Sequence, residues 1–416
     1  MTTESLASAA RPRGLLTPAF ARLWFAGGIS NAMRWLELLV AGIYTYQVTR
    51  SALAVAIVIV ARSLPMLFLG PIAGVVAEAL NRKRLLIAQL LLMAGTSAVL
   101  ATLAWTGQIQ VWHIALGGTA AGIVWASEMA VRRRMLGEDV APERIGAAVA
   151  LDSLTGSFTR VLGPLFGGAV FELLGLGGAY SLAAALYLAA LVPILGLDFR
   201  QEPRPLRFRR IAGEIAEGLA VVRATPPIVG VVLVTIVMNS FGFCYSALIA
   251  PIGVGHFQVS PILVGALAAA EPLGAIIVGI ALSAGWLRLG GSRALLQGSF
   301  LFLAGVIAMA LSPWYGLAFV VLVIGGLGTA VFSNMQTSLI LTEAPPTTRS
   351  RVAGIVTMCI GTGPLGVLAI GALSEQIGPP AAILVMAGTG ILALALVWRR
   401  LNKPARSAPA PSPSSG

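Results

Sequence analysis

The sequence predicts an all-helical membrane protein, with twelve transmembrane helices in two six-helix bundles. Of its 416 residues, 57% are hydrophobic and only 11% are charged, against roughly 25% charged in an average soluble protein. Twelve apolar stretches reach the length of about 20 residues that a helix needs to cross a bilayer. The longest polar stretch, residues 198–226, divides these stretches six and six.

The expected spans are apolar all round, whereas strands of a membrane barrel would alternate every second residue. Helices also satisfy their own backbone hydrogen bonds in lipid. The first six cover roughly residues 20–48, 52–77, 84–106, 111–131, 146–171 and 177–197. The second six cover roughly residues 226–251, 261–286, 293–312, 315–341, 351–374 and 379–398.

Basic residues set the expected orientation, because Lys and Arg near helix ends stay in the cytoplasm. If the N-terminus is inside, 24 of the 28 basic residues lie in inner segments and only Arg50 lies in an outer loop. Both termini are therefore expected in the cytoplasm, in a plasma membrane or bacterial inner membrane. We expect a lead at 1–19, a first bundle at 20–197, a linker at 198–225, a second bundle at 226–400 and a disordered tail at 401–416. Apolar residues at helical spacing in the linker favour an interfacial helix, and a plain solvated linker is the alternative.

One eight-residue pattern, G-A-x-x-E-x-x-G, occurs twice. It closes the fifth expected helix at residues 168–175 and the eleventh at residues 371–378. The two copies stand at equivalent places in the two halves. This predicts halves related by an axis normal to the membrane, a design found in transporters.

The turn after the second expected helix carries small residues, one carboxylate and basic residues. It resembles the loop signature of the major facilitator superfamily, G-x-x-x-D-[RK]-x-G-[RK]-[RK], with Glu78, Ala79 and Asn81 in place of the usual Asp, basic residue and Gly. The resemblance implies the major facilitator fold and an inner-face latch between helices. The latch residues would be Gly70, Gly74, Glu78, Arg82 and Arg84. A basic loop that only sets topology is the alternative.

The fifth expected helix contains a second motif, Gly163-Pro164-Leu165-Phe166-Gly167-Gly168. It resembles the G-P-x-x-G-G core typical of exporters in the superfamily, with Thr159 at the upstream glycine position. With Ala61 to Pro65 and Asn31 to Trp35, it is most similar to the branch that contains enterobactin-type siderophore exporters and macrolide efflux pumps. Gly163, Pro164, Gly167 and Gly168 would add to the latch by close packing and a bend, and ordinary tight packing is the alternative.

Seven ionisable residues fall inside the expected spans, where each charge costs about 2.5 to 3.5 kcal/mol at the bilayer centre. Such groups should face one another or a wet cavity. They are Arg34, Glu37, Arg62, Glu128, Asp152, Arg160 and Glu271. Glu37 and Glu271 are the first choices for a proton carrier because they lie near mid-depth, and Glu128 and Asp152 are further candidates. Structural pairing of acids with arginines is the alternative for each.

Arginine stays charged, so the arginines are expected to bind substrate or serve as fixed partners. Amides and aromatic rings in the spans would complete a site for a bulky amphipathic solute, although each is also a plausible packing contact. The substrate-binding candidates are Asn31, Arg34, Trp35, Arg62, Trp125, Arg160, Asn239, Tyr245, Asn334 and Gln336.

These features predict a secondary transporter that exports a small or medium amphipathic organic solute, with protons as the coupling ion. Uptake, lipid movement and a non-transporting receptor or channel are the alternatives. The sequence has no H-E-x-x-H, nucleophile elbow or phosphate loop, which argues against an enzyme and against direct ATP coupling. We expect no cofactor, no metal and no nucleic acid. The expected partners are the lipid bilayer, a small-molecule substrate and protons, and the chain is expected to be a monomer.

Overall fold

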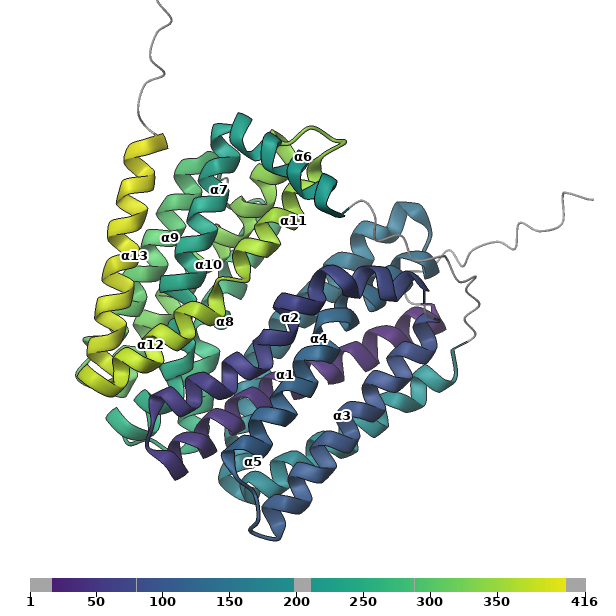
Figure 1. Ribbon diagram of the computed structural model, residues 1–416, viewed down its shortest axis with the longest axis vertical. Helices are drawn as coiled ribbons and strands as arrows, with labels where there is room; N and C mark the ends of the chain where they lie inside the picture. Colours follow the sequence, from purple (N-terminus) through teal and green to yellow (C-terminus); the bar gives the residue numbers. More distant parts are fainter. Residues whose placement is uncertain (1–16, 80, 198–210, 288, 402–416) are drawn as a thin grey trace, which may run out of the picture.

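The computed structural model describes residues 17–79, 81–197, 211–287 and 289–401, and for some helical residues it describes the backbone alone. Every regular element within these ranges is helical. The first helices are α1 (Pro18–Thr49), α2 (Ala52–Ala79), α3 (Arg82–Trp105), α4 (Val111–Asp139) and α5 (Ile145–Leu195). Residues 17–197 form the group at the lower right of Figure 1, called the first half below.

Side-chain caps mark the starts of α1 and α3. The Thr17 hydroxyl accepts a hydrogen bond from the Phe20 amide at the start of α1, where Pro18 occupies the first turn. Asn81 accepts in the same way from the Arg84 amide at the start of α3. A short 3₁₀ turn, η1 (Pro142–Arg144), precedes α5.

The helix α5 has 51 residues, too many for one crossing of a bilayer about 30 Å thick at about 1.5 Å per residue. It bends back at Gly175, whose φ of 66° and ψ of −170° are open to glycine and strained for other residues. The two arms of α5 correspond to the fifth and sixth expected spans.

Residues 226–401 form the second half, at the upper left of Figure 1. It begins with α7 (Pro226–Val237), which continues through the π and 3₁₀ turns η2 (Met238–Gly242), η3 (Phe243–Leu248) and η4 (Pro251–His256). The remaining helices are α8 (Pro261–Ser283), α9 (Gly291–Ala310), α10 (Tyr315–Glu343), α11 (Arg349–Ile360), α12 (Gly363–Ile377) and α13 (Pro379–Leu401). The eleventh expected span is thus broken between α11 and α12, where Gly361, Gly363 and Pro364 follow closely.

The linker contains a helix, α6 (Ile211–Ala224), beside α11 (Figure 1). Glu217 on α6 forms an ion pair of 2.6 Å with Arg351 on α11, and Val222 is buried. The linker therefore includes a helix anchored to the second half. The rest of the expected linker, residues 198–210, lies outside the described residues, as do most of the expected lead and tail.

Eight helical segments of the described chain are long and apolar enough to cross a membrane. They are Arg82–Trp105, Ile145–Leu195, Pro226–Leu248, Pro261–Leu282, Gly291–Ala310, Tyr315–Glu343, Arg349–Ile377 and Pro379–Arg400. Large apolar side chains such as Leu173, Leu392 and Leu365 are exposed, as expected of a surface that faces lipid. The structure is therefore an all-helical integral membrane protein, and the count of twelve spans stays a prediction.

The two copies of the repeated pattern make matching contacts between the halves. Glu172 on α5 accepts a hydrogen bond of 3.0 Å from the Ile262 amide at the start of α8. Glu375 on α12 accepts from the Leu53 amide at the start of α2 (3.0 Å) and from the Ser51 hydroxyl (2.7 Å). Each half thus supplies a carboxylate that caps a helix of the other half. We call these contacts the inter-half caps and their end of the molecule the cap end.

The first glycine of each copy allows the same helices to approach. A Cβ on Gly168 would lie 2.3 Å from the Pro261 carbonyl oxygen, and one on Gly371 would lie 2.5 Å from the Ala56 Cβ. The opposite end of the helices carries Arg82, Lys83 and Arg349 at the starts of α3 and α11, and we call it the basic end.

Candidate functional site

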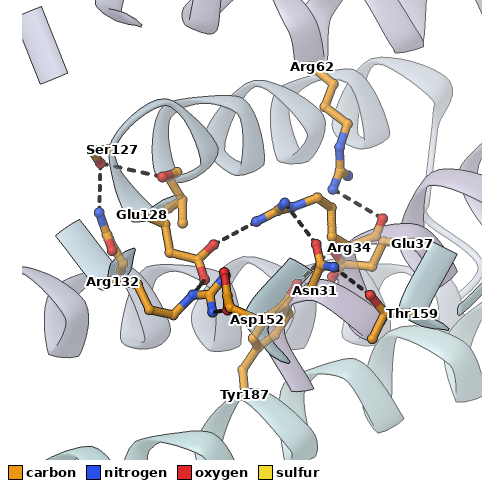
Figure 2. Close-up of polar contacts among 12 residues, drawn as sticks. Asn31, Arg34, Glu37, Arg62, Ser127, Glu128, Arg132, Asp152, Thr159 and Tyr187 are labelled. Carbon is orange, nitrogen blue, oxygen red and sulfur yellow. Dashed lines mark hydrogen bonds and ion pairs between the residues drawn. The ribbon is translucent and has the colours of Figure 1, made fainter. Parts of the chain in front are cut away.

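A network of alternating charges occupies the interior of the first half (Figure 2). Arg34 on α1 forms an ion pair of 2.6 Å with Glu128 on α4. The second Glu128 oxygen lies 3.8 Å from Arg132 one turn later, and Arg132 also pairs with Asp152 on α5. Four charges from three helices thus neutralise one another in pairs, which lowers the cost of burying them.

Neutral groups fix the position of Arg34 within this network. Its guanidinium donates to the Asn31 amide oxygen at 3.0 Å, and its Cζ lies 5.2 Å from the centre of the Trp125 ring. Asn31 in turn donates to the Thr159 hydroxyl on α5 at 2.5 Å. Asn31 and Trp125 therefore both contact Arg34 inside the first half and hold its side chain in place.

Glu37 is buried one turn further along α1, and its hydrogen-bond partners are hydroxyl groups. Ser97 on α3 donates to Oε1 at 2.7 Å, and Tyr187 on α5 donates to Oε2 at 3.2 Å. Arg62 enters from α2 and donates to the Arg34 carbonyl oxygen at 3.2 Å (Figure 2). The backbone of α2 at Arg62 packs closely against α4, since a Cβ on Gly122 of α4 would lie 2.0 Å from the Arg62 carbonyl oxygen.

A second charged site lies between the halves. Arg160 on α5 forms an ion pair of 2.9 Å with Glu271 on α8, and the Arg160 Cζ lies 5.4 Å from the centre of the Trp35 ring. The Glu271 side chain is 4% exposed, whereas that of Arg160 is 38% exposed. Three buried polar atoms here have no hydrogen-bond partner: Trp35 Nε1, Arg160 Nε and Glu271 Oε1. Such atoms are costly unless something binds them.

Two cavities open inside the first half. The larger, of about 520 Å³, is lined by Leu86, Gln89, Glu128, Arg132 and Ile194 among others. The smaller, of about 360 Å³, is lined by Glu37, Ala41, Leu100, Ile114 and Tyr180 among others. Arg62 and Met93 line both.

The expected binding residues of the second half lie elsewhere and line neither of these cavities. Asn239 donates to the Thr235 carbonyl oxygen, and Gln336 donates to the Thr235 hydroxyl at 2.6 Å. Asn334 is exposed and donates to the Ala330 carbonyl oxygen of its own helix. The contacts of these three amides are those of helix packing. Tyr245 is buried with its ring 5.8 Å from that of Phe302, and it lies close enough to Glu271 and Arg160 to interact with their charges.

The expected latch residues fall into two groups. On α5, a Cβ on Gly163 would lie 2.5 Å from the Trp35 Cβ, and one on Gly167 would lie 3.1 Å from the Leu36 Cα. Gly168 and Pro164 pack against α8, where a Cβ on Gly265 would lie 2.4 Å from the Pro164 carbonyl oxygen. After α2, Arg82 is buried and Arg84 is exposed. Gly70, Gly74 and Glu78 belong to α2, in the part of that helix for which the backbone alone is described.

Sequence reasoning missed four members of the first-half network: Ser97, Arg132, Thr159 and Tyr187. Arg132 stands four residues after Glu128, a spacing that predicts a polar stripe on one helix face, but it was counted with the basic residues of an inner segment and not among the site residues. Ser97, Thr159 and Tyr187 had no distinguishing pattern.

Comparison with curated proteins finds exporters of bacterial origin. The enterobactin exporter EntS of Shigella boydii serotype 18 (strain CDC 3083-94 / BS512) is 29% identical over 267 residues, 62% of this chain and 61% of the relative. EntS of Escherichia coli O139:H28 (strain E24377A / ETEC) aligns to the same extent. The alignment spans less than two thirds of these relatives' length.

Solved transporters share the fold across nearly the whole chain. A bacterial homologue of the human lysosomal transporter Spinster, inward-facing and unoccupied, has a TM-score of 0.68 at 16% identity, covering 93% of this chain and 94% of its own. A bacterial homologue of the iron transporter ferroportin, in an inward-facing state, has a TM-score of 0.69 at 16% identity, covering 92% and 99%. At such identities the likeness shows the fold alone.

A family model supplies the stronger evidence. The family described as transmembrane secretion effector, within the major facilitator superfamily, matches residues 10–415. The matched family and the structural neighbours are transporters rather than enzymes. With its buried intramembrane charges and its helical fold, the chain belongs to the transmembrane secretion effector family of major facilitator transporters.

Proposed function

We propose that this transporter exports a small or medium amphipathic organic solute by alternating access, in exchange for protons. The observation that carries the proposal is the Arg160–Glu271 pair, which joins the halves near the middle of α5 and α8. Movement of the halves against each other would strain or break this pair, so its state would follow the conformation of the protein.

In this proposal the membrane topology is the twelve-span arrangement, with bundles at 20–197 and 226–400 and both termini in the cytoplasm. Four spans must be added to the eight segments above. α1, α2 and α4 have 32, 28 and 29 residues, each enough to cross a bilayer, and the bend at Gly175 divides α5 into two arms. The bacterial relatives support an inner-membrane location.

The solute site is proposed at the interface between the halves, around Trp35, Arg160 and Glu271. The Trp35 ring offers an apolar face, and the unpartnered atoms Trp35 Nε1, Arg160 Nε and Glu271 Oε1 offer two donors and one acceptor. This combination suits a solute with both an aromatic or apolar body and polar groups. Export is favoured because the curated relatives are named as exporters.

Two of the four expected proton carriers suit the role best. Glu128 and Asp152 are each paired with arginine inside the first half, so a proton on either would leave an arginine without its counter-charge. Glu37 accepts its hydrogen bonds from hydroxyl groups and takes part in none of the described ion pairs, so a proton on it would break no ion pair. Glu271 has one oxygen paired with Arg160 and the other without a partner. We therefore assign proton coupling to Glu37 and Glu271.

Proteoliposomes with an imposed pH gradient test the proposal on a panel of siderophores, antibiotics and lysolipids. The unaltered protein should move at least one solute against an opposite flow of protons, and E271Q should reduce this coupled flux at least tenfold. E343Q, at an exposed position at the end of α10, is the matched control. Co-directional flow would favour uptake, solute movement without protons would favour uncoupled transport, and binding without movement would favour a receptor; each of these results contradicts the proposal.

A further inference from the structure

The two cavities of the first half lie end to end along the helices. The larger is lined by the part of each helix nearer the basic end, for example Leu23 on α1, Leu86 on α3 and Ile194 on α5. The smaller is lined by the part nearer the cap end, for example Ala41 on α1, Leu100 on α3 and Tyr180 on α5. We call them the basic-end cavity and the cap-end cavity.

Polar side chains stand among the mainly apolar walls of the basic-end cavity. Arg34, Arg132, Glu128 and Tyr187 contribute polar atoms, and the buried Gln89 has an amide oxygen without a hydrogen-bond partner. The space that the centres of water molecules could occupy here is about 30 Å³, more than the roughly 10 to 15 Å³ that one buried water needs. The cap-end cavity has Glu37, Arg62, Thr96 and Tyr180 as its polar lining.

Glu37 lies where the two cavities meet. Glu37 lines the cap-end cavity, and Tyr187, whose hydroxyl donates to Glu37, lines the basic-end cavity. Arg62 lines both cavities. A proton could thus reach Glu37 from one cavity through the Tyr187 hydroxyl and leave directly into the other.

Each helix packed around Glu37 places a charged or hydroxyl-bearing side chain near it. Arg34 is on α1 itself, Arg62 is on α2, Ser97 on α3, Glu128 on α4, and Tyr180 and Tyr187 on the second arm of α5. Arg34 is already paired with Glu128, which leaves Arg62 as the cation to balance an ionised Glu37. Arg62 would therefore act as a positioning residue that holds Glu37 ready to release its proton.

We propose that these cavities are two water-filled half-channels that bring protons to Glu37 from one end of the first half and remove them toward the other. This path runs inside the first half and is distinct from the interface between the halves, where Glu271 lies and the solute would move. In the loading step a hydronium ion in one cavity gives its proton to the Glu37 carboxylate and becomes water. In the release step neutral Glu37 gives the proton to water in the other cavity and becomes a carboxylate again. The inference rests on the proton coupling proposed above.

Cysteine accessibility tests hydration without requiring transport. In a C244S/C359S background, A121C would place a thiol in the wall of the basic-end cavity and A41C one in the wall of the cap-end cavity. A small cationic methanethiosulfonate reagent should modify A121C only from the basic-end side of a vesicle and A41C only from the cap-end side. A98C, on the exposed face of α3, is the control for a thiol outside both cavities. If neither cavity cysteine reacts faster than A98C, the half-channels are dry and the inference is wrong.

Blocking the path tests its role. A121F and A41F should each lower coupled proton flux at least tenfold, measured in proteoliposomes with an entrapped pH dye and the panel solute that the unaltered protein moves. Affinity for that solute should change less than threefold, and A98F should retain normal flux. Normal proton flux in both cavity variants would place the proton path at the interface instead. If a phenylalanine variant does not fold, the cysteine reactivities decide. No proton flux in the unaltered protein, with reactive cavity cysteines, would contradict the proposed coupling and leave the hydrated cavities standing.

Discussion

Removal of the inter-half caps should open the cap end. Glu172 and Glu375 each accept hydrogen bonds from the first turn of a helix in the opposite half, at 2.7 to 3.0 Å. These contacts can form only while the halves are in contact at this end. The substitutions E172A and E375A remove the carboxylates and leave the helices that carry them intact.

The size of the effect follows from the number of caps. Loss of a side-chain cap costs typically about 1 kcal/mol at a solvent-exposed helix start. The two caps join different helix pairs, α5 with α8 and α12 with α2, so their losses should add. The double variant should therefore lose about 2 kcal/mol of preference for the closed cap end, a shift of roughly 30-fold in the ratio of closed to open molecules.

Pulsed dipolar spectroscopy between spin labels measures this ratio. Labels at V48C on α1 and W314C before α10 report on the two halves, since both side chains are exposed, in the C244S/C359S background. Each single variant should increase the long-distance population several-fold, and the double variant should increase it most. E343A is the control, because Glu343 is an exposed carboxylate at the other end of α10. A double variant whose distance distribution matches that of E343A would refute the role given to the caps.

Two further substitutions test the packing of the first half. G122A places a Cβ 2.0 Å from the Arg62 carbonyl oxygen and should destabilise the fold by about 1 to 3 kcal/mol, seen as a lower thermal unfolding midpoint in detergent. G95A, which meets nothing within 4 Å, should not lower it, and equal losses in both variants would contradict the close α2–α4 contact. R34M leaves Glu128 without its 2.6 Å partner and should cost about 3 to 5 kcal/mol. R34M/E128L should recover most of this loss in the same measurement, and a double variant no more stable than R34M would argue against the pair.

The sequence predicted the helical fold and the membrane setting because both follow from local composition. It also found Gly175, the bend in α5, as the end of a repeated pattern. The sequence did not predict the irregular turns that follow α7. Apart from Pro251, no proline or glycine pattern distinguishes the π and 3₁₀ turns after Val237 from an ordinary transmembrane helix. Their shape depends on packing against neighbouring helices.

The charged residues were found for a reason that holds in any bilayer: an isolated charge there is costly, so each one needs a partner. The sequence did not predict which residue each charged side chain would contact. The spacing of three residues between Arg34 and Glu37 permits either a local pair or contacts across the cavity. In the structure Arg34 pairs with Glu128 on α4, and Glu37 accepts a hydrogen bond from Ser97 on α3. Pairing across 60 to 94 residues depends on how the helices are arranged, which spacing along one helix does not encode.

The two halves share some features and differ in others, and the difference bears on the mechanism. The inter-half caps occur twice, as Glu172 and Glu375, so they suit the proposed motion, in which both halves would take equal part. The network around Arg34 has no counterpart among the described ion pairs of the second half, where Glu271 pairs with an arginine of the first half. A feature kept in only one half is not needed for rocking itself. The charges inside the first half therefore fit a task that one half performs alone, and transfer of protons through its interior is such a task.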